Sequence, residues 1–337
     1  MQDPEKTHNR GSIFIKNLPS IPFARSLFKY ENKMLEQNIL GLNFKNPVGL
    51  AGGFDKNAIM IDGLACFGFG FMEFGAVTHR PYAGNPGKKV VRLPKDKALI
   101  INYGLMNDGS KIIVQRIKKK YPFVVGINIA KTNDPSIKGE QSVEDYFKTY
   151  DLFRKKVSYC TLNISCPNTG DGMTFQEPKL FKNLIKRIKD TEKVCPIFVK
   201  LSAEPPKVDQ LFEIIKKESL IDGIILTNLS KDRSILKTKV SDEQKGGISG
   251  KPVKEKSQRL VEEAYKSFKS KKIIIGCGGI FNAKDAYERI KGGANLLQLV
   301  TGFIYGGPFT IKKINQGLVK LLKEDGYSNI SDAIGKH

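Results

Sequence analysis

The amino-acid sequence predicts an α/β protein that folds as a closed (β/α)8 barrel with a short N-terminal helical extension. From residue 47 onward, short apolar runs alternate with amphipathic stretches, and there are eight of each. Alternation of this kind predicts a parallel sheet whose strands are joined by helices. Eight repeats favour a closed barrel over an open doubly wound sheet. In addition, polar side chains gather where the apolar runs end, and that end of a barrel carries the chemistry.

The strand candidates are apolar nearly throughout, as strands buried on both faces should be. They cover residues 47–52, 69–77, 124–130, 160–165, 196–202, 223–229, 273–279 and 296–302. The helix candidates repeat their apolar residues at intervals of three and four, as Leu180, Leu184 and Ile188 do. They cover residues 57–66, 110–121, 142–155, 178–193, 207–219, 254–270, 282–291 and 308–322.

The N-terminal segment lies outside this alternating pattern. We therefore expect residues 1–44 to form an extension or cap, residues 45–325 to form the barrel, and residues 326–337 to form a tail. The extension mixes apolar and basic residues around two prolines. A lid packed on the barrel and a contact with a membrane surface both fit such a segment. The apolar side chains available for either role include Phe14, Phe23, Leu27 and Phe28.

The composition narrows the class of protein. With 56 basic and 34 acidic residues the net charge is +22, which suits an anionic small substrate, an anionic membrane surface or nucleic acid. Lysine runs such as "RIKKKY" resemble solvated helix faces, and arginine-rich stripes interleaved with aromatics are missing, so nucleic acid is the disfavoured partner.

Cysteine and histidine usage predicts neither disulfides nor a metal site. The five cysteines are widely spaced without a C-x-x-C pair, and the three histidines are far apart. The first residues lack a signal-peptide core, and no window approaches 18 uninterrupted apolar residues. We expect a cytoplasmic protein, with peripheral contact at the inner membrane as the alternative.

Six polar residues occur in or just after five of the first six predicted strands, the second strand being the exception. Polar side chains that point into a barrel mouth need partners, and a bound ligand supplies them. The last two strands end in glycine-rich turns, "GCGGIF" and "VTGFIYGGP", a place where barrels commonly bind phosphate through backbone N–H groups. A third such turn is "KGGISGKP". The six polar residues are Lys56, Asn128, Asn163, Cys166, Lys200 and Asn228.

Taken together, these motifs resemble the dihydroorotate dehydrogenase family, FMN-dependent (β/α)8 flavoenzymes of pyrimidine biosynthesis. The resemblance runs from about Asp3 to beyond Phe309 and implies oxidation of dihydroorotate to orotate. Its markers, in the family's order, are "FKNPVGLAGGFDKN", "GFGFMEFGAVTHRPYAGNP", "VGINIAK", "LNISCPNT", "VKLS", "DGIILTN", "GGISGKP", "GCGGI" and "QLVTGF".

The resemblance implies a role for particular residues. Lys200 would lie at the N1/O2 edge of the flavin, where a cation stabilises the reduced ring. Cys166 would be the general base that removes the C5 proton while hydride leaves C6 for flavin N5, since a thiol ionises near neutral pH. The implied substrate contacts are Lys56, Asn163, Asn168 and Asn228. The implied cofactor contacts are Ala51, Gly52, Gly53, Lys56, Ala76, Asn128, Asn163, Lys200, Thr227, Gly250, Gly279, Thr301 and Gly302.

Two branches of the family differ in their electron acceptor. A cysteine base is typical of the soluble branch, whereas the N-terminal segment resembles the membrane-associated, quinone-reducing branch. His8 and Arg92 match residues that line the quinone tunnel of that branch, although Val300 stands where a tyrosine is usual. We expect a quinone as acceptor, with fumarate as the alternative.

Three departures from the family pattern concern the substrate. Aligned without a gap, Ile101 replaces an asparagine that touches substrate and flavin, whereas a one-residue deletion would place Asn102 there. Leu229 stands where a threonine or serine donates to the pyrimidine, and the arginine of the active-site loop is missing from "NTGDGMTFQEP". Three alternatives therefore stay open: an FMN-dependent relative acting on another C–C bond, a non-redox phosphate-binding barrel, and a non-catalytic flavoprotein that engages nucleic acid.

Overall fold

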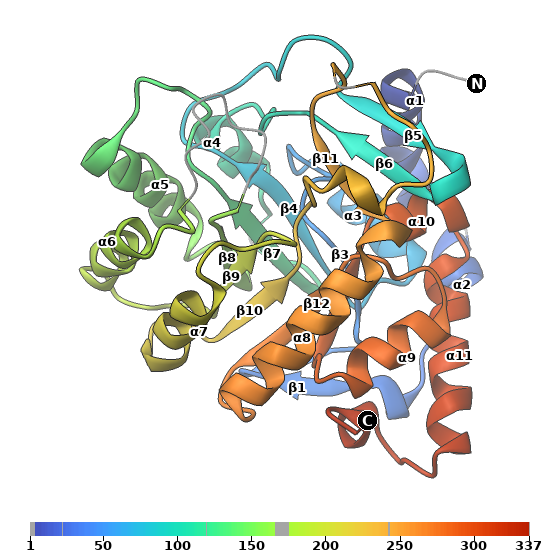
Figure 1. The fold of residues 1–337 in the computed structure, drawn as a ribbon. Helices are drawn as coiled ribbons and strands as arrows, with labels where there is room; N and C mark the ends of the chain where they lie inside the picture. The colour runs from blue at the N-terminus through green and yellow to red at the C-terminus, as the bar shows by residue number, and fades with distance from the viewer. Residues whose placement is uncertain (1–3, 22, 119, 166–174, 242, 337) are drawn as a thin grey trace.

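The predicted barrel is present and closed. The computed structural model describes residues 4–21, 23–118, 120–165, 175–241 and 243–336 (Figure 1). Eight parallel strands pair around the barrel in the order β10-β12-β13-β3-β4-β7-β8-β9, and each falls within or next to a predicted strand. Their bounds are β3 (Val48–Leu50), β4 (Phe71–Val77), β7 (Val124–Ile129), β8 (Tyr159–Asn163), β9 (Ile197–Leu201), β10 (Gly223–Leu226), β12 (Ile273–Cys277) and β13 (Leu296–Leu299).

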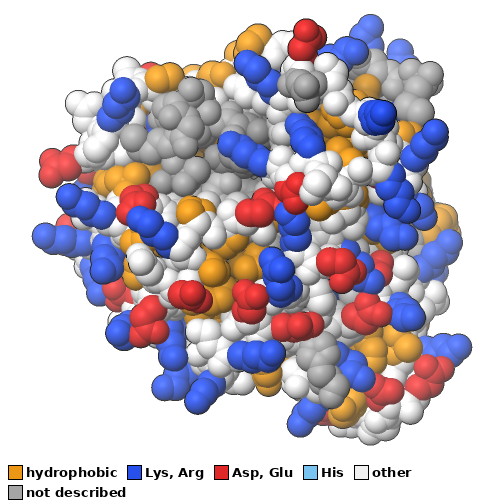
Figure 2. All heavy atoms as spheres, viewed as in Figure 1, with side chains coloured by type: hydrophobic (Ala, Val, Ile, Leu, Met, Phe, Trp, Pro, Cys, Tyr) orange, Lys and Arg blue, Asp and Glu red, His pale blue; other side chains and the backbone are white. Residues whose placement is uncertain are grey.

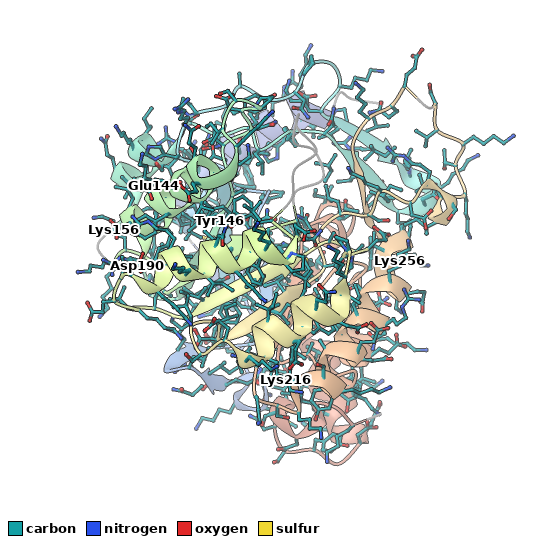
Figure 3. The ribbon with its side chains drawn as sticks, turned by 60° about the vertical axis from the view of Figure 1, so that its left-hand side comes forward. Glu144, Tyr146, Lys156, Asp190, Lys216 and Lys256 are labelled. Carbon is teal, nitrogen blue, oxygen red and sulfur yellow. The ribbon has the colours of Figure 1, made fainter. Side chains whose placement is uncertain are left out.

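Amphipathic helices cover the outside of the barrel, as their apolar spacing predicts. Their apolar sides pack on the strands, and their outward sides carry charged groups such as Glu144 and Lys216 (Figure 3). Arg187 and Glu144 join two neighbouring helices through a 2.8 Å ion pair. The bounds are α5 (Gly139–Phe153), α6 (Pro178–Lys189), α7 (Val208–Lys217), α8 (Lys254–Phe268), α9 (Ala283–Lys291) and α11 (Thr310–Glu324).

Two of the predicted helices are much shorter than expected. The stretch 57–66 contains only α3 (Ile61–Leu64) and part of a 3-10 turn, and 110–121 contains α4 (Ser110–Ile113) followed by another 3-10 turn. The Asp55 carboxylate accepts the N–H groups of Ile59 and Met60, so a side-chain-bonded turn replaces the first helical turn.

Aromatic rings fill the N-terminal end of the barrel. The rings of Phe71 and Phe44 meet edge to face at 5.3 Å, and those of Tyr159 and Phe198 do the same at 5.3 Å. Gly126 leaves room for the Tyr159 ring, because a Cβ at that position would lie 2.1 Å from it. The hairpin of β1 (Gln37–Ile39) and β2 (Leu42–Phe44) lies at this end. In the described part of the chain, side chains therefore close the N-terminal end of the barrel, and the cleft lies at the opposite, C-terminal end.

A small antiparallel sheet, which the strand pattern does not predict, lies beside the C-terminal end of the barrel. It consists of β5 (Val90–Leu93), β6 (Ala98–Ile101) and β11 (Gly247–Gly250) (Figure 1). Asp96, in the turn between β5 and β6, accepts the N–H groups of Lys237 and Thr238. Burial alone would favour the neutral carboxyl, but the hydrogen bonds from Thr238 and Lys237 hold the pKa of Asp96 below its ordinary value. The long connection after β10 is tied to the sheet through this carboxylate.

Two helices precede the first barrel strand. Helix α1 (Pro4–Asn17) packs on α3 and β5, and it is followed by the short helix α2 (Ala24–Phe28). Ile15 of α1 is buried, whereas Phe14 is 57% exposed and Phe23, just before α2, is 85% exposed. None of the described helices combines the length and the apolar character that a membrane span requires.

On the face that Figure 2 shows, charge is spread rather than collected in one patch. Lys and Arg side chains are interleaved there with Asp and Glu (Figure 2). Many of the basic groups are paired, as Lys256 is with Glu204 and Asp232. This arrangement agrees with solvated helix faces as the explanation of the lysine runs.

Candidate active site

A cleft of about 1150 Å³, open to solvent, lies at the C-terminal ends of the barrel strands beside β6 and β11. It brings together every described residue that the sequence predicted for the cofactor and the substrate. These are Ala51, Gly52, Gly53, Lys56, Ala76, Asn128, Asn163, Lys200, Thr227, Asn228, Gly250, Gly279, Thr301 and Gly302.

Three asparagine amides form one side of the cleft and are linked to one another. Asn163 Nδ2 donates to Asn128 Oδ1 at 2.9 Å, and Asn228 Nδ2 donates to Asn163 Oδ1 at 3.3 Å. Asn128 Nδ2 in turn donates to the buried carboxylate of Glu73 at 2.7 Å. The asparagines come from β7, from the end of β8 and from the residues after β10, so closure of the barrel brings them together.

Lys200 supplies a buried positive charge to the same cleft. It lies on β9, where its backbone is level with that of Asn163 on β8, and only 4% of it is exposed. Within the described residues its ammonium group makes no hydrogen bond or ion pair. Because a buried charge without a partner is costly, the site is built for a ligand with an electron-rich edge at this point.

Glycine turns form the far end of the cleft. Gly250, Gly278 and Gly279 have φ values of +101°, +104° and +75°, which favour glycine. A Cβ on Gly279 would lie 2.4 Å from Lys254, so the backbone approaches α8 more closely than any side chain allows. Nearby, the buried Thr227 hydroxyl has no hydrogen-bond partner among the described residues. Glycine turns that line the cleft and an unpaired hydroxyl suit a phosphorylated ligand.

These features fit FMN. A flat ring needs a floor without side chains, which Gly52 and Gly53 provide, and its polar edge needs amides and a cation, which Asn128 and Lys200 provide. The orphan hydroxyl of Thr227 and the glycine turns would then hold the ribityl phosphate. Among the described residues, no three His, Cys, Asp or Glu side chains come together in a way that could hold a metal ion.

Lys56 stands at the mouth of the cleft next to Tyr103. Its Nζ lies 3.8 Å from the centre of the Tyr103 ring, within the range of a cation–π contact. Burial lowers the pKa of Lys56 to about 8, and the carboxylates of Asp55 and Glu5 oppose that shift only in part. Lys56 is therefore still charged at neutral pH but close to its titration range.

The structure shows which of the two residues Ile101 and Asn102 faces the cleft. Ile101 lines the cleft, whereas Asn102 is turned to the other side of the chain and accepts a hydrogen bond from Asn85 at 2.9 Å. Successive side chains of an extended strand point to opposite faces, so only one of the two can face the ligand. Leu229 also lines the cleft, and its Cβ lies only 2.6 Å from where a Cβ of Gly247 would be.

The two residues predicted for a quinone site lie outside the cleft. His8, on α1, meets the ring of Phe54 edge to face at 5.3 Å, and burial, with the charge of Lys56, lowers its pKa to about 4. Arg92 lies on β5, the strand on which α1 packs. The two residues thus belong to neighbouring elements.

Cys166 and Asn168 lie outside the described residues. The chain reaches them from Ser165, which is buried and whose Oγ donates to Asn163 Oδ1 at 3.2 Å. Of the other cysteines, Cys277 lines the cleft, and Cys160 and Cys195 are in contact with each other at 3.7 Å.

The sequence reasoning missed the polar residues beneath the cleft. Glu73 is the most important of them, and its signal was available: it is a charged residue in the middle of the otherwise apolar stretch 69–77. Thr161 and Gln298, which also bond to Glu73, lie within apolar strands in the same way.

Comparisons with known proteins show to which family the chain belongs. The family model described as dihydroorotate dehydrogenase matches residues 34–322. A protein named dihydroorotate dehydrogenase (quinone) from a Nitratiruptor species is 36% identical over 341 residues, covering 99% of this chain and 95% of its own. The protein of the same name from Christiangramia forsetii is 39% identical over 329 residues, covering 94% and 95%.

Solved structures agree as well. The crystal structure of DHODH from Eimeria tenella in complex with ferulenol superposes with a TM-score of 0.86 at 29% identity, covering 100% of this chain and 96% of that one. The ligand-free type of the same enzyme gives a TM-score of 0.88 at 29% identity, covering 99% of each chain. The chain belongs to the dihydroorotate dehydrogenase family.

Proposed function

We propose that this protein oxidises dihydroorotate to orotate, with FMN as cofactor and a quinone as electron acceptor. The observation that carries the proposal is the cleft itself. It holds a glycine floor, linked amides, a buried lysine and glycine turns in one place. Its lining includes Asn163, the last residue of β8, three residues before Cys166 in the chain. The names of the curated relatives support both the substrate and the acceptor.

The chemistry divides between the cofactor and the chain. Bound FMN supplies a two-electron acceptor for the hydride that leaves C6 of the substrate. Cys166, as thiolate, takes the proton from C5, so that the C5–C6 single bond becomes double. Lys200 stabilises the negative charge that arises on the ring edge, and Asn163 and Asn228 orient the pyrimidine.

The absorption spectrum tests the proposal most directly. The purified protein should be yellow, and anaerobic addition of dihydroorotate should bleach the flavin absorbance. A quinone added afterwards should restore the colour faster than fumarate does. Protein that takes up FMN and keeps its colour in excess dihydroorotate would contradict the substrate assignment, whereas failure to bind FMN would contradict the cofactor.

Lys56 makes substrate binding depend on pH. Its lowered pKa of about 8 means that the ammonium group is present below pH 8 and lost above it. Since the charged form is the one that pairs with a carboxylate, we expect the dissociation constant of orotate to rise up to tenfold per unit above pH 8. The measurement is a flavin difference-spectrum titration between pH 6.5 and 9. A Lys56→Met variant should bind more weakly throughout, without this rise.

We also assign residues 1–44 a role at the membrane. The side chains of Ile13, Phe14, Phe23 and Leu27 are between 53% and 85% exposed, and a net charge of +22 favours anionic lipid. His8 and Arg92, on α1 and the adjoining β5, are proposed to line the path of the quinone. In this arrangement the extension brings the lipid-borne acceptor to the barrel.

Introducing charged side chains into the apolar surface tests this role. The variant Phe14→Asp/Phe23→Asp should bind vesicles containing phosphatidylglycerol about tenfold more weakly, because two aromatic side chains no longer enter the interface. Its turnover with a short-chain, water-soluble quinone should be unchanged. The control is Ile112→Asp, which alters a side chain that is 50% exposed on α4. Equal vesicle binding by both variants and the wild type would refute the membrane role.

A second candidate function keeps FMN but changes the substrate to one with another C–C bond. The presence of Ile101 and Leu229 in the cleft favours it, since neither side chain can donate a hydrogen bond to a pyrimidine. A missing hydrogen bond to a buried polar substrate costs about 1–3 kcal/mol. If dihydroorotate reduces the flavin at a rate that matches the rate of turnover with quinone, this candidate function is excluded.

A further inference from the structure

Glu73 is a fully buried carboxylate in the middle of β4, directly beneath the cleft. It accepts hydrogen bonds from Asn128 Nδ2 at 2.7 Å, Thr161 Oγ1 at 2.7 Å and Gln298 Nε2 at 3.2 Å. These donors come from three different strands, β7, β8 and β13. The carboxylate is therefore the centre of a polar network in the interior of the barrel.

The network has a direction, because a carboxylate only accepts hydrogen bonds. Asn128 must turn its NH2 group towards Glu73, which leaves its Oδ1 to accept from Asn163 at 2.9 Å. Asn163 then has its own Oδ1 free to accept from Asn228 at 3.3 Å and from Ser165. The orientation of each amide is thus set by the one before it, beginning at Glu73.

This direction determines what the cleft offers a ligand. Asn128 and Asn163 each use one N–H of the amide within the chain of bonds, and among the described residues the second has no partner. The amide of Asn228 donates to both Asn163 Oδ1 at 3.3 Å and Ser165 Oγ at 3.2 Å. All three amides line the cleft. The site therefore presents N–H donors, which match the carbonyl and carboxylate oxygens of an orotate-like ligand.

Glu73 lies immediately behind the floor of the cleft. A Cβ on Gly52 would be 2.9 Å from Glu73 Oε1 and 2.9 Å from Asn128 Cβ, so one glycine separates the carboxylate from the ligand space. Glu73 itself does not line the cleft. It can act on a ligand only through the residues that it holds.

We infer that Glu73 is a positioning residue that fixes the orientation of Asn128, and through it of Asn163 and Asn228, so that Asn128 and Asn163 present N–H groups to the cleft and Asn163 offers its own to the substrate. This inference rests on the proposed function, since it concerns how the same cleft recognises the oxidised pyrimidine. Its specific requirement is an acceptor atom at position 73, not a negative charge.

The requirement distinguishes two substitutions of similar size. Glu73→Met offers Asn128 no acceptor, so the amides are free to reverse. Glu73→Gln keeps one acceptor oxygen for Asn128, and its new N–H group can bond to Gln298 Oε1, an atom that is buried without a partner among the described residues of the wild type. The glutamine variant should therefore rescue what the methionine variant loses.

The experiment is a titration of each FMN-loaded variant with orotate, followed by the flavin difference spectrum. We expect the dissociation constant to rise about tenfold or more in Glu73→Met and to stay within about threefold of the wild type in Glu73→Gln. If Glu73→Met does not fold, Glu73→Asp takes its place, because its shorter side chain moves the acceptor away from Asn128. Wild-type affinity in whichever of these two variants folds would overturn the inference.

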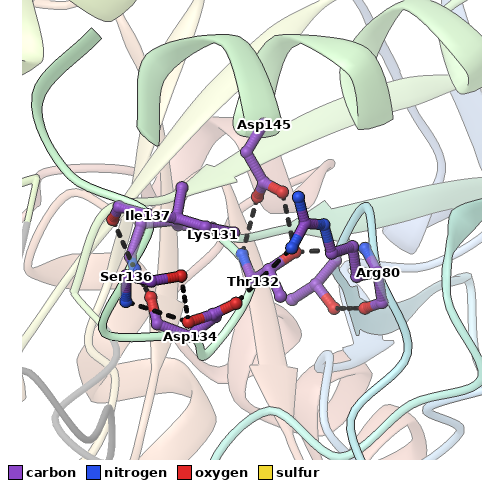
Figure 4. A network of polar contacts seen from close by, with 8 residues as sticks. Arg80, Lys131, Thr132, Asp134, Ser136, Ile137 and Asp145 are labelled. Carbon is purple, nitrogen blue, oxygen red and sulfur yellow. Dashed lines mark hydrogen bonds and ion pairs between the residues drawn. The ribbon is translucent and has the colours of Figure 1, made fainter. Parts of the chain in front are cut away.

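A second buried carboxylate provides the control for lost stability. Asp145, on α5, accepts from Thr132 N at 2.8 Å and from Thr132 Oγ1 at 2.9 Å, in a network outside the cleft (Figure 4). Asp145→Leu should lower the melting temperature and leave orotate affinity unchanged. An equal loss of affinity in this control would also overturn the inference. If the wild type itself fails to bind orotate, the proposed function fails instead, so the two failures are distinguishable.

Discussion

Replacing Cys166 with alanine should leave FMN bound and lower the rate of flavin reduction by dihydroorotate about 10²- to 10⁴-fold. The reason is that general-base catalysis typically contributes this much, and the cofactor contacts lie on other residues. Stopped-flow measurement of flavin bleaching under anaerobic conditions gives the rate. The flavin content of the purified variant serves as the internal check that the site is intact.

A serine at position 166 makes the comparison sharper. A hydroxyl is far harder to ionise than a thiol, whose ordinary pKa is near 8.5. The rate of Cys166→Ser should therefore lie below that of the wild type at neutral pH and continue to increase above the pH at which the wild type has levelled off. If both variants reduce flavin at the wild-type rate, the proton is taken by another group.

The second large effect concerns Lys200, whose substitution by methionine should act in opposite directions on function and on stability. Without the cation, the negative charge on the reduced ring is no longer stabilised, and flavin reduction should slow by about 10²- to 10³-fold. In the apo-protein, the same substitution removes a buried charge that has no partner among the described residues, so the melting temperature should rise.

Lys272 provides the matched control for this prediction. It is a partly buried lysine directly before β12, at the end of the barrel opposite the cleft, and its Nζ donates to the carbonyls of Glu218 and Ile221. Lys272→Met should therefore lower the melting temperature and leave flavin reduction unchanged. A Lys200→Met variant that loses stability in the apo form, as the control does, would contradict the assignment of Lys200 to the ligand.

The sequence was sufficient for the barrel because the information is local. Each strand is an apolar run and each long helix has apolar residues at intervals of three and four, so burial on both faces or on one face can be read directly. Of the two helices that were overpredicted, the one at 57–66 has an equally local cause that spacing does not reveal. At 57–60 the carboxylate of Asp55 bonds to the backbone and replaces the first helical turn.

Long-range pairing was beyond the sequence. Strand β11 pairs with β6 across a separation of almost 150 residues, and neither strand has an alternating pattern strong enough to predict it. The same holds for the choice between Ile101 and Asn102. One residue of register decides which of them faces the cleft, and the register is set by pairing with Val90 and Gly247.

The same distinction between local and long-range information applies to the site. By itself, the sequence determined which residue types stand at the ends of the strands. The strands of the barrel are parallel, so all of these ends lie at the same mouth. Only the tertiary structure decided how they are oriented: the buried Glu73 turns Asn128 towards itself, and each following amide takes its direction from its neighbour. The physical reason is that a hydrogen bond needs a particular atom of a particular partner, and those partners meet only when the barrel closes.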